Sequence, residues 1–168
     1  MATWYLRDRS RMSVLVVGSV AYDSVVTPAG SREGALGGSA TYFSVACGYF
    51  APVGIVAVVG DDFRPEHMEL LRRHNIDVSG LERKEGQTFR WSGVYSSEDV
   101  NARRTLDTQL NVFADFSPTI GARHKDTPYI FLANIDPDLQ LDVLGQIETR
   151  PTLVALATMN YWNEGKNR

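Results

Sequence analysis

Two adjacent glycines, Gly37 and Gly38, stand directly before an apolar run, Ala40–Phe50, which has the small and apolar content of a buried helix. Glycine allows positive φ and lets another group approach the backbone where a Cβ would otherwise stand. The first amides of a helix have no intrahelical partner. The segment therefore predicts either a site where a hydroxyl-rich or anionic ligand meets bare backbone amides, or a tight turn that feeds a buried helix.

A carboxylate, Asp23, follows the short β-branched segment Ser13–Gly18, which is typical of a strand buried on both faces. Open α/β sheets keep ligand contacts beyond the carboxyl ends of their strands. Because a carboxylate can accept hydrogen bonds from two vicinal hydroxyls, Asp23 is a candidate for holding a sugar. A turn or cap aspartate is the alternative interpretation. The residues after Gly18 lack the G-x-G-x-x-G spacing, so a dinucleotide site is not predicted.

A β-hairpin is predicted over about residues 87–110. Thr88–Tyr95 alternates and is rich in aromatic and β-branched residues, and Arg103–Gln109 resembles its returning strand. A hairpin between α/β units is expected to form a lid beside the main sheet, not within it.

The aromatic residues of this hairpin allow three interpretations. Phe89, Trp91 and Tyr95 could stack over a ligand. They could equally pack against a second copy of the hairpin, which would make a homodimer. Ordinary core packing is the third interpretation, and the sequence does not choose among them.

Strand and helix patterns alternate along the chain, which predicts an α/β fold with a mostly parallel sheet and right-handed crossovers. Strands are expected over Ser13–Gly18, Pro52–Gly60, Pro128–Asn134 and Pro151–Ala157, all of them buried. Helices are expected over Ala40–Phe50, Arg64–His74 and Pro137–Ile147. The segment Val25–Leu36 indicates short edge strands or a mobile hairpin.

Local signals mark the ends of two helices. Asp61 or Asp62 is expected to cap the second helix, with ligand binding as a secondary role. Asp136 is the expected N-cap of the third helix, with Pro137 at its first position. Asn75 fits a left-handed position at the end of the second helix.

Residues 1–12 are expected to form a flexible N-terminal extension, because the apolar run that follows their charges is too short for a signal peptide. The sequence stops soon after the last predicted strand, which would leave a sheet edge with nothing to cover it. Residues 13–168 are therefore expected to be part of a domain.

The composition is that of a globular protein, with 43% apolar and 22% charged residues in 168. A net charge of -3 and the lack of a Lys/Arg-rich block argue against nucleic-acid binding. The longest apolar run is too short to span a membrane. The single cysteine, Cys47, cannot form an intrachain disulfide, so a cytoplasmic setting is predicted. Its side chain is interpreted as a buried small hydrophobe.

The three histidines predict no metal site. His67 and His74 are seven residues apart, whereas helical metal pairs occupy adjacent turns, and His124 is remote from both.

In order and spacing, these features resemble the N-terminal half of the ribokinase/PfkB family of carbohydrate kinases. The matching pieces are the strand Val14–Gly18 followed by Asp23, the Gly37–Gly38 pair before a helix, the segment Val58–Asp62, the strand-rich insertion after it, and the loops that carry Asn134 and Asn160. The resemblance covers about residues 13–162. It implies an α/β, ribokinase-like three-layer sandwich with a mostly parallel sheet and a small β lid, whose C-terminal half is absent from this sequence.

The resemblance also implies an activity, namely ATP-dependent transfer of phosphate to a hydroxymethyl group of a sugar or nucleoside, assisted by Mg²⁺. Asp23 would hold substrate hydroxyls, the glycine pair would contact the sugar through the backbone, and the lid would often form part of a dimer interface. The full set of substrate-binding candidates is Asp23, Gly37, Gly38, Tyr42, Phe89, Trp91, Asn134 and Asn160.

The sequence departs from the family pattern in several places. Tyr42 stands where many members have asparagine, Ala157 stands where many have aspartate, and Phe50–Ala51 matches poorly the small residue before the next strand. The Gly-Ala-Gly-Asp anion hole with its catalytic aspartate and the Asn-x-x-Glu metal motif do not occur, so this chain alone is predicted to be inactive.

Two readings compete with that of a partial kinase. One is a non-catalytic module that binds a small molecule or dimerises through its hairpin. The other, an unrelated Rossmann-like nucleotide-binding domain, is disfavoured by the missing glycine fingerprint.

Overall fold

The computed structural model describes residues 13–99, 102–159 and 162, so the predicted extension over residues 1–12 lies outside the described part. The elements in chain order are β1 (Val14–Val17), β2 (Ala21–Thr27), β3 (Gly30–Gly37), α1 (Ser39–Gly48), β4 (Val53–Gly60), α2 (Pro65–Arg73), β5 (Ile76–Lys84), β6 (Phe89–Tyr95), β7 (Arg103–Gln109), η3 (Asn111–Phe113), η4 (Ala122–His124), β8 (Tyr129–Leu132), α3 (Pro137–Gly145) and β9 (Leu153–Leu156).

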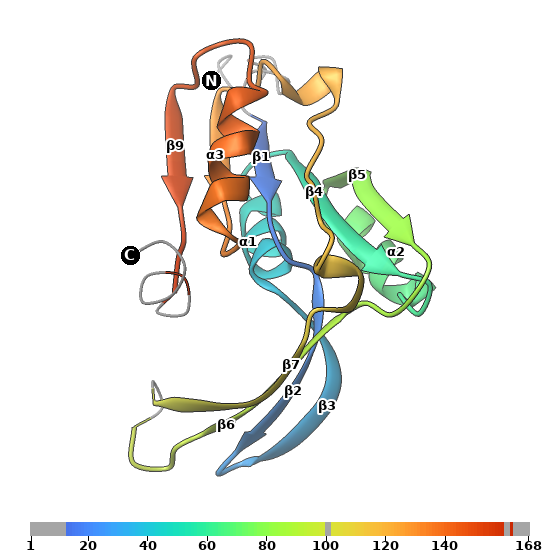
Figure 1. Cartoon of the computed structure of the whole chain (residues 1–168), viewed down its shortest axis with the longest axis vertical. Coiled ribbons are helices and arrows are strands. Elements are labelled where there is room, and N and C mark those ends of the chain that lie inside the picture. Colours follow the sequence, from blue (N-terminus) through green and yellow to red (C-terminus); the bar gives the residue numbers. More distant parts are fainter. Residues whose placement is uncertain (1–12, 100–101, 160–161, 163–168) are drawn as a thin grey trace, which may run out of the picture.

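The main sheet has five parallel strands in the order β5-β4-β1-β8-β9. Its central strands come from the β-branched runs that the sequence predicts as buried, and every residue of β4 is buried. The strands point the same way, and a second sheet extends from the edge where they end (Figure 1). The prediction of an α/β fold with a parallel sheet is confirmed.

Apolar side chains cover both faces of the main sheet. Val16 of β1 belongs to a cluster that includes Leu71 of α2. The neighbouring Leu15 and Val17 point the opposite way, into a cluster that includes Val143 of α3. In Figure 1, α3 lies in front of the sheet, and α1 and α2 lie behind it. The predicted three-layer arrangement is therefore confirmed.

The second sheet, called the lid sheet below, has four strands in the order β3-β2-β6-β7. The predicted hairpin is its β6–β7 pair, and the predicted edge hairpin is its β2–β3 pair. Parallel pairing of β2 with β6 joins the two hairpins, which the sequence pattern does not predict. The lid sheet stands beside the main sheet, as expected (Figure 1).

The predicted cap of α2 is wrong. Arg64 occupies the N-cap position and makes no side-chain cap hydrogen bond, while Pro65 begins the helix. The carboxylate of Asp62 instead accepts hydrogen bonds from Thr88 and Arg90 of the lid sheet. These donors satisfy it more fully than one helix amide would, because Arg90 adds a charge.

The other two end signals are confirmed. Asp136 caps α3 by accepting a hydrogen bond from the amide of Asp138 at 2.9 Å, and Pro137 follows it. Asn75 has φ 58°, in the left-handed region.

Both edges of the main sheet differ from expectation. The sequence does not predict β5, because its polar residues and Gly80 break the apolar pattern of a strand. The predicted burial of the last strand is wrong, since all four residues of β9 are exposed. In the part of the chain that the structure describes, β9 pairs only with β8.

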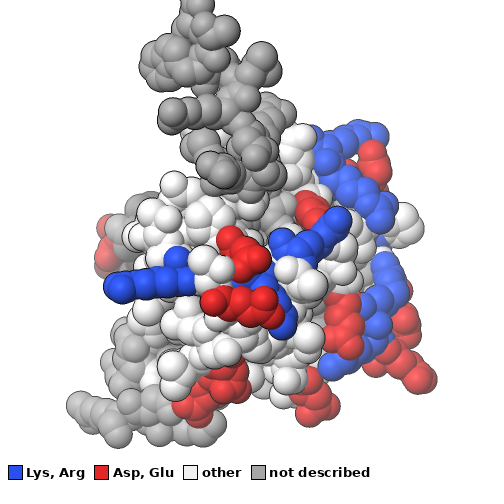
Figure 2. Space-filling model, turned by 90° about the horizontal axis from the view of Figure 1, so that it is seen from above, with Lys and Arg blue, Asp and Glu red and all other residues white. Residues whose placement is uncertain are grey.

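Charged side chains of both signs are interspersed on the face opposite the lid sheet (Figure 2). Among the ion pairs of the surface are Arg123 with Asp77 at 2.8 Å and Lys125 with Glu148 at 2.9 Å. None of the described helices is long and apolar enough to cross a membrane.

Candidate functional site

Asp23 and the glycine pair meet where the lid sheet leaves the main sheet. A Cβ on Gly37 would come 2.0 Å from Oδ2 of Asp23, so only glycine leaves room for the carboxylate. Gly38 has φ +92°, and a Cβ there would come 2.4 Å from the carbonyl oxygen of Ser19. The glycine pair therefore serves both a turn and a close approach, and it places the carboxylate at the start of α1.

One of the two predictions for the glycine pair requires bare backbone amides at the start of α1. In the structure these amides already have hydrogen-bond partners. Gly38 donates a backbone hydrogen bond to Asp23. Ser39 donates its amide to Oγ of Ser19 at 3.1 Å, and Ala40 donates its amide to the Ser19 carbonyl at 3.0 Å. The helix start thus anchors Asp23, whose carboxylate is the main candidate for contact with a ligand.

Burial raises the pKa of Asp23, while the hydrogen bond from Gly38 and the charge of Arg103 oppose that rise. A carboxylate with a raised pKa in the folded state lowers stability at neutral pH, because folding favours its protonated form. Binding groups that cost stability are common at functional sites.

Asp23→Asn is therefore expected to raise the melting temperature by about 1–4 °C at neutral pH, with the gain fading as the pH falls through the raised folded pKa and gone below the unfolded pKa of about 4. The change in melting temperature is measured by thermal unfolding, with circular dichroism as the signal. Asp142→Asn, at an exposed position of α3, is the control and should change the melting temperature by less than about 1 °C. Lower stability of Asp23→Asn at neutral pH would contradict the expectation.

Aromatic side chains of β6 lie on the same face of the lid sheet as Asp23. Trp91 pairs in register with Asp23, so the two side chains share that face. The indole lies over Gly93, where a Cβ would come 2.3 Å from Cη2 of Trp91. Its Nε1 donates to Oγ1 of Thr105 at 3.3 Å, and the guanidinium of Arg103 stands 5.9 Å from the ring.

Tyr42 faces this group from α1. Burial raises the pKa of Tyr42, and the nearby Asp23 and Tyr95 raise it further. The Tyr42 side chain is nonetheless 61% exposed, so much of its ring is open to solvent. Tyr95 is in register with Arg103 on β7. Arg103 is the member of this group that the sequence does not reveal, because an arginine in a polar strand carries no local signal.

Phe89 and Asn134 have other partners. Phe89 stacks on Phe113, with ring centroids 5.2 Å apart, and so joins the base of the lid sheet to η3. The side chain of Asn134 contacts Sδ of Met159 at 3.0 Å and accepts a hydrogen bond from Trp162 at 2.9 Å. Asn160, the last predicted binding residue, lies outside the described residues.

The reverse face of the lid sheet is fastened to the main domain. The ring of Tyr22 lies between the guanidinium groups of Arg64, at 5.1 Å, and Arg90, at 5.4 Å. Arg90 binds Asp62 at 2.6 Å, and Thr88 donates to the same carboxylate. Tyr22 directly precedes Asp23, so this cluster, called the clasp below, holds the strand that carries the candidate binding carboxylate.

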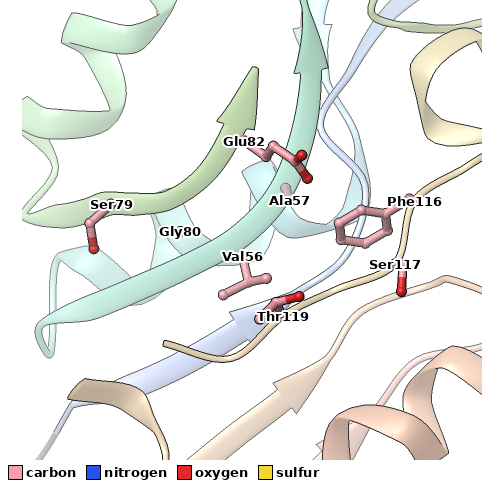
Figure 3. Close-up of a pocket in the computed structure, with 8 residues that line it drawn as sticks. All are labelled: Val56, Ala57, Ser79, Gly80, Glu82, Phe116, Ser117 and Thr119. Atoms are coloured by element: carbon pink, nitrogen blue, oxygen red, sulfur yellow. The ribbon is translucent and has the colours of Figure 1, made fainter. Parts of the chain in front are cut away.

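A cavity of about 380 Å³ lies elsewhere, on the face of the main sheet away from α1 and α2. Its lining comes from β4, β5 and the segment 116–119 (Figure 3), namely Val56, Ala57, Ser79, Gly80, Glu82, Phe116, Ser117 and Thr119. None of the predicted binding residues lines it. Among the described residues, no group of three or more His, Cys, Asp or Glu side chains could hold a metal ion.

Several known proteins that are similar to this chain in sequence or structure are kinases. A cytidine kinase of Thermococcus kodakarensis is 25% identical over 144 residues, which are 85% of this chain and 51% of that protein. A nucleoside kinase of Methanocaldococcus jannaschii, an archaeal member of the ribokinase family, matches with a TM-score of 0.66 at 17% identity, over 86% of this chain and 52% of its own. Ribokinase of Cryptococcus neoformans in complex with ADP matches with a TM-score of 0.70 at 17% identity, over 87% of this chain and 49% of its own.

The chain has the ribokinase-like fold, and the resemblance that the sequence indicates is confirmed. It spans about half of the length of these relatives. No protein-family model matches it.

Proposed function

We propose that this chain forms the acceptor-binding part of an ATP-dependent kinase that phosphorylates a hydroxyl group of a sugar or nucleoside. The observation that carries the proposal is the placement of Asp23: its carboxylate occupies the space of a missing Cβ at Gly37, beside the lid sheet. The fold and the kinase relatives support the same activity.

Within this proposal, Asp23 accepts hydrogen bonds from two neighbouring hydroxyls of the acceptor. The backbone of the glycine pair contacts the sugar, and Asn134 and Asn160 line the cleft. The lid sheet covers the acceptor and excludes water, which favours phosphoryl transfer by positioning. A cytoplasmic setting belongs to the same proposal.

ATP and Mg²⁺ belong to the proposed activity of the whole kinase. Among the described residues, no group of three or more His, Cys, Asp or Glu could hold a metal ion, and no residue of this chain is assigned to Mg²⁺. No step of the transfer is therefore assigned to this chain, whose proposed role is to bind and orient the acceptor.

Thermal unfolding with and without a panel of free sugars and nucleosides tests the proposal. At least one polyhydroxylated ligand is expected to raise the melting temperature, because a ligand that binds only the folded state stabilises it. Asp23→Asn is expected to abolish that increase although its own melting temperature is not lowered. A panel without any effect on the wild-type chain would contradict the proposal.

A second proposed role is homodimerisation through the lid sheet. All seven residues of β7 are exposed, and Leu106 of this edge strand is 51% exposed. An exposed edge strand can pair with a second copy. Light scattering after size-exclusion chromatography is expected to show a dimer for the wild type and a monomer for Leu106→Lys; a wild-type monomer at high concentration would exclude this role.

A further inference from the structure

We infer that the acceptor is a nucleoside, whose base stacks on an aromatic subsite beside Asp23. The inference rests on the proposed function and narrows its substrate class. The aromatic subsite consists of Tyr42, Trp91, Tyr95 and Arg103. Trp91 is in register with the candidate binding carboxylate, Tyr42 and Arg103 interact with it electrostatically, and Tyr95 lies near Tyr42.

The subsite draws its rings from two separate elements. Trp91 and Tyr95 lie on β6, on the Asp23 face of the lid sheet, and Tyr42 reaches the same carboxylate from α1. A ligand held by Asp23 therefore has aromatic side chains both on the lid and on the main domain. A nucleoside has a ribose for the carboxylate and a planar base for the rings, whereas a free pentose has no planar group to stack on them.

The contacts of the Trp91 indole favour a planar ligand. Its indole is held in place over Gly93 by the hydrogen bond to Thr105. The guanidinium carbon of Arg103 lies over this ring, 5.9 Å from its centroid, the distance of a cation–π contact. A nucleobase is planar, and its carbonyl or ring nitrogen can accept a hydrogen bond from Arg103.

Charge distinguishes a nucleoside from a nucleotide at this site. The pKa of Asp23 is raised by its burial, and a phosphate next to a carboxylate would add like-charge repulsion. Arg103 is the nearby cation, and it already acts on Asp23. The site therefore suits an uncharged ligand.

Titration calorimetry with ribose, cytidine and adenosine tests the inference on the full chain. The nucleosides are expected to bind at least about ten-fold more tightly than ribose, the contribution of one stacked base. Trp91→Leu should weaken nucleoside binding about ten-fold and change ribose binding by less than about two-fold. Trp91→Phe keeps a ring and should retain most of the preference, which separates loss of stacking from damage to the fold.

The other possible binding results would overturn the nucleoside inference, the proposed function or both. Equal affinities for ribose and nucleosides would overturn the inference and leave the proposed function standing, as would an equal loss for both ligands in Trp91→Leu. Binding of neither ligand class would overturn both. Tighter binding of a nucleoside monophosphate than of its nucleoside would overturn the assignment of an uncharged ligand.

Discussion

Gly38→Ala is expected to lower the free energy of unfolding by about 3 kcal/mol or more and to abolish acceptor binding. Two effects add at this position. The backbone has φ +92°, which L residues rarely adopt, and the new Cβ would come 2.4 Å from the Ser19 carbonyl oxygen and 2.9 Å from the amide nitrogen of Ala21. Both contacts are with backbone, which cannot rotate away. Relief would move β2, and Asp23 with it.

Gly30→Ala is the matched control. Gly30 also has positive φ, +143°, but nothing lies within 4 Å of its Cβ position. This variant therefore bears only the conformational cost, about 1–2 kcal/mol. Urea denaturation measures both variants, and a similar loss in the two would show that the contacts of Gly38 with β2 are unimportant.

The parts of the fold that the sequence predicts are those with local signals. The runs that become β1 and β4 are apolar and β-branched, which a strand buried on both faces requires, and the run that becomes β8 is apolar. The N-cap of α3 is predicted from two consecutive residues, Asp136 and Pro137. The features that the sequence does not predict depend on distant partners: β5 is held at an edge by β4, and β2 pairs with a strand far along the chain.

The candidate site also has some features that the sequence predicts and others that depend on distant partners. The glycine pair and Asp23 are visible in the sequence because their residue types permit few other roles. Of the two alternatives that the sequence leaves open for the glycine pair, bare amides do not apply to Gly38, Ser39 and Ala40, because Ser19 and Asp23 already bind them and nothing local shows it. Asp62 is also misassigned: its spacing before a helix suggests a cap, and only the folded structure brings Thr88 and Arg90 to it.

Asp62→Ala is expected to lower the free energy of unfolding by about 2–4 kcal/mol at neutral pH, because it removes the acceptor at the centre of the clasp. One carboxylate oxygen accepts the amide of Thr88 at 2.7 Å and its hydroxyl at 2.6 Å, and the other accepts Arg90 at 2.6 Å. Thr88 is fully buried, so its amide would lose a partner without access to water. Asp61→Ala is the control, because Asp61 is exposed and accepts only a 3.3 Å bond from Gly86 among the hydrogen bonds resolved here.

The pH dependence of the free energy of unfolding lost in Asp62→Ala identifies the Asp62 carboxylate as the group responsible. Burial alone would raise the pKa of Asp62, but the hydrogen bonds from Thr88 and Arg90 outweigh burial and hold the pKa below its ordinary value. A depressed pKa contributes stability that is present above the unfolded pKa of about 3.9 and is lost as the pH falls through the folded pKa. The difference between wild type and Asp62→Ala should therefore shrink in acid; a difference that is constant from neutral pH to about pH 3 would contradict this account.

The clasp also bears on binding, since it fixes the strand next to the candidate site. Without Asp62, Arg90 loses its anchor, and one of the two guanidinium groups that flank Tyr22 is free to move. Tyr22 and Asp23 are consecutive in β2 and project to opposite faces of the lid sheet. Hydrogen exchange of the β6 amides in Asp62→Ala should consequently quicken while exchange in β8 stays slow, because Arg90 lies on β6, whereas Ile130 and Leu132 of β8 belong to a core cluster that contains no clasp residue.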